Sequence, residues 1–217
     1  MISAASFGMS GREQMPCYRK RMEDVNIKGT KNIIKVCRMN RIECLVYTST
    51  YNVVFGGQVI VGGDESLPYF PLHRHVDYYS KTKSIAEQLV LASNGKPTGT
   101  RTCALRLAGV IGPGEARHLP RMIQAIQSGW MRFYYHDQHG GLVDFIGIDN
   151  VVQGHVKAAV KLLDGSMDIG GQAYFLSDGS PINSFEYFRP LFEHFGRPEP
   201  AYRIPVAFMY VLVLAFI

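Results

Sequence analysis

The chain has 217 residues, of which 47% are hydrophobic and 19% charged, so it is long enough to bury a sizeable core and too apolar to be disordered. Its formal net charge of +5 is modest and scattered. No basic stretch is interleaved with aromatic residues, so nucleic-acid binding is not expected.

Hydrophobic periodicity predicts helices that alternate with short apolar strands. In chain order we expect helix 22–37, strand 44–48, helix 79–92, strand 102–107, helix 119–128, strand 142–148, helix 150–163, strand 173–176 and helix 184–195. Asp149 is expected to cap the fourth of these helices. This alternation predicts an α/β fold with a doubly wound parallel sheet, whose ligand crevice lies beyond the carboxyl ends of the strands.

The four cysteines form no C-x-x-C pair. Cys37, Cys44 and Cys103 fall in apolar helix or strand patterns, which predicts buried, reduced thiols and a reducing compartment. Two closely spaced histidine pairs lie in polar segments without acidic or thiol partners. We therefore expect surface histidines there and no metal site.

Tyr79 and Lys83 are four residues apart at the start of a predicted helix, so they share one helix face. An ammonium near a phenol favours the ionised phenol and lowers its pKa, which is otherwise near 10. A phenol of this kind can exchange a proton with a carbinol or a carbonyl group near neutral pH. Tyr78 has Thr82 at the same spacing, so the pattern selects Tyr79 as the acid/base candidate.

A cluster of hydroxyl side chains ends the strand predicted before this helix. Thr50 is the main candidate for a hydroxyl that orients the substrate oxygen, and Ser49 is the reserve. The hydroxyl-tipped strand and the Tyr/Lys pair together are typical of a nicotinamide-dependent dehydrogenase. The long loop between them, residues 56–77, is rich in Gly and Pro, and loops of this length usually have a function.

The chain resembles the extended short-chain dehydrogenase/reductases of the 3β-hydroxysteroid dehydrogenase group, above all the short-chain dehydrogenase/reductase family 42E proteins. The matching segments occur in family order and cover most of the chain. They are Ser6 to Gln14, Val25 to Ile33, Leu45 to Gly57, Tyr79 to Gln88, Arg101 to Gly114 and Val143 to Val152.

The resemblance implies a catalytic set of Tyr79, Lys83 and Thr50, and NAD as the cofactor, with NADP as the alternative. It also implies that Lys83 contacts the nicotinamide ribose. Other cofactor-lining positions implied by the family are Ala5, Ser6, Leu107 and Val110. The implied partners are a steroid-like substrate, membrane lipid and a second copy of the chain.

Three positions depart from the family pattern. Leu107 stands where the family usually has Pro, Ile111 where it has Tyr, and Gly147 where it often has His. The sequence also contains no G-x-x-G-x-x-G or G-x-G-x-x-G turn, the feature that lets backbone and helix dipole approach a pyrophosphate. We therefore expect a chain that lacks the first strands of the fold, as a fragment, an alternative product or an incomplete gene model.

Residues 206–217 are uninterrupted apolar sequence, shorter than the roughly 20 residues of a bilayer span. A core helix fits this run, but the lack of a polar face favours part of a membrane-associated helix. The family includes membrane-bound members, which implies an intracellular membrane such as the endoplasmic reticulum, with the catalytic part facing a reducing compartment.

The predicted organisation is a partial dinucleotide-binding domain over residues 1–110, a mixed substrate lobe with returning sheet elements over 111–205, and the apolar segment 206–217. The predicted function is hydride transfer between a nicotinamide cofactor and a secondary alcohol or ketone of a steroid-like lipid. Two alternatives remain open: a sugar-nucleotide epimerase or dehydratase of the same fold, and a catalytically inert truncated product.

Overall fold

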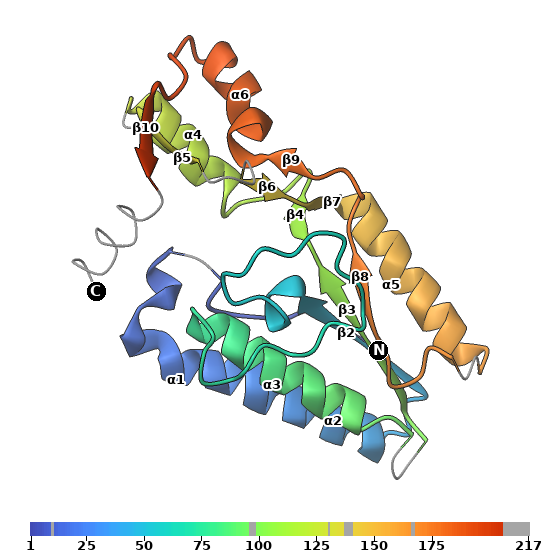
Figure 1. Cartoon of the computed structure of the whole chain (residues 1–217). Helices are drawn as coiled ribbons and strands as arrows, with labels where there is room; N and C mark the ends of the chain where they lie inside the picture. The colour runs from blue at the N-terminus through green and yellow to red at the C-terminus, as the bar shows by residue number, and fades with distance from the viewer. Residues whose placement is uncertain (10, 96–98, 130, 137–140, 166–167, 206–217) are drawn as a thin grey trace. The chain divides into compact units, whose positions relative to one another are not determined.

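The computed structural model describes residues 1–9, 11–95, 99–129, 131–136, 141–165 and 168–205. Its main sheet has four parallel strands in the order β1-β2-β3-β8 (Figure 1). Their bounds are β1 Ile2–Ser3, β2 Cys44–Thr50, β3 Arg101–Leu107 and β8 Ala173–Leu176. Parallel neighbours need helical crossovers, and helices separate these strands in the chain. The predicted α/β class with a parallel sheet is confirmed.

Helices cover both faces of this sheet. One continuous helical stretch consists of α1 (Arg19–Met22), the π-helical segment η3 (Glu23–Lys28) and α2 (Gly29–Met39). It lies beside α3 (Tyr78–Ala92), as the blue and green ribbons of Figure 1 show. The helix α5 (Ile148–Leu163) packs on β2 and β3 from the opposite face.

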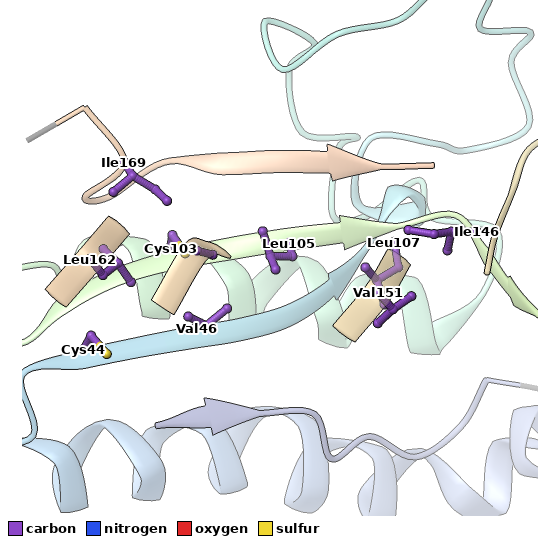
Figure 2. Close-up of a cluster of buried hydrophobic side chains, with 10 residues drawn as sticks. Cys44, Val46, Cys103, Leu105, Leu107, Ile146, Val151, Leu162 and Ile169 are labelled. Carbon is purple, nitrogen blue, oxygen red and sulfur yellow. The ribbon is translucent and has the colours of Figure 1, made fainter. Parts of the chain in front are cut away.

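Alternation along β2 and β3 divides the core into two clusters, because successive strand side chains point to opposite faces. Leu45 and Tyr47 pack with Ala104 on the side of α2 and α3. The intervening strand side chains face α5, as Figure 2 shows for Cys44, Val46, Cys103, Leu105 and Leu107. Val151 and Leu162 of α5 pack against them. Cys37, Cys44 and Cys103 are buried free thiols, as predicted.

Two expectations from the sequence are wrong in detail. The segment predicted as one strand over 142–148 forms two short strands, β6 (Leu142–Val143) and β7 (Phe145–Gly147), and α5 already begins at Ile148. Asp149 is therefore not the cap: the N-cap residue is Gly147, without a side-chain hydrogen bond. Asp149 lies in the first turn, where its negative charge still favours the positive end of the helix dipole.

The chain divides into two compact units. The first contains residues 1–110 and 146–177, and the second contains 111–145 and 178–217. In the second unit β5 pairs with β10 in parallel, β6 pairs with β9 in antiparallel, and Phe145 stacks on Tyr187 with ring centroids 4.4 Å apart. The remaining bounds are η1 Gly11–Gln14, η2 Pro16–Tyr18, η4 Tyr51–Val53, β4 Gly109–Ile111, α4 Leu119–Gln127, β5 Phe133–His136, β9 Ile182–Asn183, α6 Ser184–His194 and β10 Tyr202–Pro205.

Within the described part of the chain, no helix combines the length and the apolar composition needed to cross a bilayer. The apolar run 206–217, predicted to be membrane-associated, lies outside the described residues.

Two adjacent leucines of α5 test how this helix packs on the core. Leu162 is fully buried, whereas Leu163 is 50% exposed. Leu162→Ala should lower the free energy of unfolding by about 2–5 kcal/mol, because it leaves a cavity. Leu163→Ala should change it by less than about 0.5 kcal/mol. Equal losses in urea unfolding would contradict the observed packing of α5.

Candidate active site

The predicted site residues come together at the carboxyl ends of neighbouring parallel strands. Thr50 ends β2 and lies in register with Leu107, which ends β3. Ala5 and Ser6 follow the end of β1, the strand on the other side of β2. Val110 lies in β4, three residues beyond Leu107. This edge of an open parallel sheet is where ligands bind in α/β folds.

Helix α3 begins beside this edge with a well-formed cap. The Asp77 carboxylate accepts a hydrogen bond from the backbone N–H of Ser80 at 2.7 Å and another from the Ser80 hydroxyl at 2.6 Å. The cap fixes Tyr79 in the first helical turn. Tyr79 and Lys83 are only 4% and 2% exposed, so the helix face predicted from their spacing is buried.

Tyr78 points to different partners from those of Tyr79. Its hydroxyl donates a hydrogen bond to Glu23 of η3, and the Arg19 guanidinium lies 5.3 Å from its ring centroid. The hydrogen bond to Glu23 raises the pKa of Tyr78. The Tyr78 phenol thus belongs to the contact between α3 and the preceding helix.

Lys83 carries its ammonium group into the interior, between two oxygen acceptors. Nζ donates to the Tyr47 hydroxyl and to the backbone carbonyl of Thr48, both at 2.7 Å. Nζ also lies 4.1 Å from the centroid of the Tyr47 ring. Burial lowers the pKa of Lys83 to about 7. Lys83 can therefore gain or lose a proton near neutral pH.

The three hydroxyls that end β2 have different environments. Ser49 donates to Glu87 of α3. On the opposite face of the sheet, Thr48 Oγ1 lies 2.7 Å from Nε2 of His155, whose Nδ1 donates to the carbonyl of Val151 at 2.8 Å. In the tautomer that carries its hydrogen on Nδ1, Nε2 accepts from the Thr48 hydroxyl.

Thr50 differs from both of its neighbours. Its Oγ1 accepts the backbone N–H of Asn52 at 3.3 Å, within the turn that follows the strand. A hydroxyl that accepts in this way still has its own hydrogen to donate. Thr50 can thus donate to a further acceptor, whereas Ser49 is engaged with Glu87.

Asn26 ties the segment that follows β1 to α3. This asparagine is 1% exposed. Its amide makes two hydrogen bonds with the backbone of Phe7: it accepts from the N–H at 2.9 Å and donates to the carbonyl at 2.8 Å. The same amide donates to Thr82 Oγ1 at 2.9 Å. The segment around Ser6 and the helical turn that carries Lys83 are thus held together.

A buried ion pair lies one turn beyond Lys83 on the same helix face. Nε and Nη2 of Arg106 donate to one Glu87 oxygen at 2.9 and 2.8 Å, and the Tyr69 hydroxyl donates to that oxygen at 2.7 Å. The pair connects α3 with β3 and with the 56–77 loop. Glu87 was not predicted from the sequence, although extending the four-residue spacing from Tyr79 and Lys83 reaches it.

Among the residues that the structure describes, no cluster of three or more His, Cys, Asp or Glu side chains is placed to hold a metal ion.

The ion pair generates the second prediction. Arg106→Met should lower the free energy of unfolding by about 3–5 kcal/mol, because it leaves the Glu87 charge buried and unpaired. Adding Glu87→Leu should recover part of that loss. Lys28→Met, which breaks an exposed pair with Asp24, should have little effect. A double variant no more stable than Arg106→Met would contradict this coupling.

Comparisons with known proteins agree with this architecture. Solved structures with the same fold include UDP-glucuronic acid 4-epimerase from Bacillus cereus in complex with NAD, with a TM-score of 0.71, 20% identity, and coverage of 93% of this chain and 61% of that one. MoeE5 in complex with UDP-glucose and NAD gives a TM-score of 0.67 at 26% identity, covering 93% of this chain and 64% of that one.

Sequence relatives are closer. Short-chain dehydrogenase/reductase family 42E member 1 of Homo sapiens is 53% identical over 212 residues, which cover 95% of this chain and 53% of that protein. The 3 beta-hydroxysteroid dehydrogenase/Delta 5-->4-isomerase of Mycobacterium tuberculosis is 38% identical over 197 residues, covering 90% and 52%. The chain thus spans about half the length of these relatives. Residues 2–206 match the 3-beta hydroxysteroid dehydrogenase/isomerase family, and the chain belongs to that family.

Proposed function

We propose that the whole protein is an oxidoreductase that transfers hydride between a nicotinamide dinucleotide and a secondary alcohol or ketone of a steroid-like lipid. The observation that carries the proposal is the burial of Tyr79 and Lys83 on one face of α3, next to the strand that Thr50 ends. Membership of the 3-beta hydroxysteroid dehydrogenase/isomerase family supports this reaction class.

NAD is the proposed cofactor, with NADP as the alternative, because structural relatives were solved with NAD or NADPH. The residues fit this cofactor in one specific respect. An ammonium has three donors, and the described partners of Lys83 Nζ take two of them. The third is available for a ribose hydroxyl, as the family resemblance implies. Ala5, Ser6, Leu107 and Val110 would line the remainder of the site.

The bound nicotinamide would supply or accept the hydride. Tyr79 would give a proton to the substrate oxygen in the reduction and take it back in the oxidation. Thr50 would donate a hydrogen bond to the same oxygen and orient it. Lys83 would lower the pKa of the phenol when protonated, with Tyr47 and the Thr48 carbonyl holding its side chain in place.

The sugar-nucleotide reaction is the second candidate function, because MoeE5, solved with UDP-glucose and NAD, is 26% identical and has the same fold. An inert product is the third, because the sequence contains no glycine-rich phosphate-binding turn. Turnover of any substrate would exclude the inert product. The substrate that turns over, a steroid alcohol or a sugar nucleotide, then distinguishes the two enzymes.

The catalytic prediction is tested with a version of the protein in which a glycine-rich dinucleotide-binding segment precedes residue 1. In that version Tyr79→Phe should reduce turnover about 100-fold or more, because the acid/base group is lost. Thr50→Val should reduce turnover more than Ser49→Ala. The measurement is the change in reduced-cofactor absorbance with a steroid alcohol or with a sugar nucleotide.

Full activity of Tyr79→Phe would contradict the mechanism, and a larger effect of Ser49→Ala would move the orienting hydroxyl to Ser49. Turnover of the sugar nucleotide alone would favour the second candidate. No turnover with either substrate would favour the inert product.

We also propose that the protein associates with an intracellular membrane, such as the endoplasmic reticulum, through its apolar run 206–217. Burying these twelve side chains in lipid, at about 25 cal/mol per Å², would stabilise the bound state by several kcal/mol. Cells expressing the chain with and without residues 206–217 would be fractionated. The intact chain should sediment with membranes and the shortened chain should not. Recovery of both chains as soluble monomers would contradict the proposal.

A further inference from the structure

Residues of the loop between η4 and α3 line an open pocket. The pocket has a volume of about 500 Å³ and is lined only by residues between Val54 and Pro71. This volume is in the range of small-molecule sites. Most of the lining is apolar or aromatic, and its larger side chains are Val54, Val59, Ile60, Leu67, Tyr69 and Phe70.

The polar side chains of the lining are already engaged within the loop. Gln58 donates to the carbonyl of Val54 at 2.8 Å and accepts the N–H of Gly56 at 2.7 Å. Asp64 accepts the N–H of Ser66 at 2.9 Å, and hydrogen bonds from Ser66 lower the pKa of this carboxyl. Asp64 is therefore negatively charged at neutral pH, and no Lys or Arg belongs to the pocket lining. Such a lining repels a diphosphate and suits an uncharged, apolar molecule.

The walls of this pocket are held in place by close contacts. Phe70 lies against Gly56, where an added Cβ would come within 2.0 Å of the ring, and its N–H donates to the carbonyl of Val53 at 2.9 Å. Tyr69 is fixed from inside the domain through its 2.7 Å hydrogen bond to Glu87. The helix that carries Tyr79 and Lys83 thus also positions a wall of the pocket.

The tip of the same loop exposes apolar side chains. Val59, Ile60 and Val61 are 54%, 37% and 87% exposed, although they are consecutive in the sequence. Three adjacent apolar residues in water form a surface that binding of an apolar molecule would cover.

We propose that the 54–71 loop is a binding site for an uncharged apolar molecule and that Tyr69, held by Glu87, is a positioning residue of that site. The inference rests on the proposed function for one point, that the bound molecule is the steroid-like substrate. The lining contains no Lys or Arg and carries the anionic Asp64, which also favours this substrate class over a sugar nucleotide.

The test measures binding to the 217-residue chain without any cofactor. Nile red, a neutral apolar dye, serves as the fluorescent probe, and a neutral steroid alcohol and UDP-glucose serve as competitors. The steroid should displace the dye, and UDP-glucose should not. Val59→Asp should weaken dye and steroid binding at least about 10-fold, because it places a charge among the apolar side chains of the lining. Val36→Asp, at a valine of α2 that is 44% exposed, should leave binding unchanged.

A second pair of variants tests the role of Tyr69. Tyr69→Phe removes the hydrogen bond to Glu87 and should weaken steroid binding by about 2- to 10-fold, the scale of one hydrogen bond. Tyr174→Phe is the matched control, because its hydroxyl donates to the carbonyl of Asp168 at 3.1 Å, outside the pocket. Urea unfolding of every variant separates lost binding from lost folding.

Unchanged steroid affinity in folded Val59→Asp, or displacement of the dye by UDP-glucose alone, would overturn the proposal. A change from dimer to monomer in Val61→Asp, with unchanged dye binding, would also overturn the proposal. The loop tip would then be a contact surface between two copies of the chain. Steroid binding without turnover in the version that carries the glycine-rich segment would count against the proposed function alone. Steroid turnover that is equal in wild type and Val59→Asp would overturn the pocket alone.

Discussion

The burial of charged groups along one face of α3 is the constraint on which the rest of the first unit depends. Lys83 and Glu87 are 2% and 0% exposed, and Tyr79, one turn earlier, is 4% exposed. A charge in the interior is tolerated only when other groups hydrogen-bond to it or neutralise it. The sheet provides those groups: Tyr47 and the Thr48 carbonyl for Lys83, and Arg106 for Glu87. These contacts tie α3 to β2 and β3, the two strands that end at Thr50 and Leu107.

The two faces of the sheet consequently have different roles. The face toward α5 carries the larger apolar cluster, which packs β2 and β3 against that helix. The face toward α3 combines a smaller apolar cluster with the polar chain of Lys83, Glu87 and Arg106. Through Tyr69 the same polar chain reaches the 54–71 loop, so the predicted acid/base residues and the proposed binding pocket share one support.

Local patterns predicted the features that depend on local spacing. The alternation of apolar runs predicted β2, β3, β8 and the parallel sheet, and the four-residue spacing predicted that Tyr79 and Lys83 share a face. The partner of Lys83 could not be predicted, because Tyr47 reaches Nζ only through the packing of α3 on β2. The π-helical turn of η3 and the start of α5 before Asp149 were also missed, since both depend on tertiary contacts more than on local propensity.

The pKa of Lys83 tests the account most directly, because it reports whether the ammonium is buried between Tyr47 and the end of β2. The measurement is an NMR titration of the lysine ε-carbons, with the Lys83 signal assigned by its loss in Lys83→Arg. The expected midpoint of the Lys83 titration is about pH 7, well below the ordinary value of 10.5. A midpoint near 10.5 would mean that Lys83 is exposed to water, and it would contradict the structure proposed for this site.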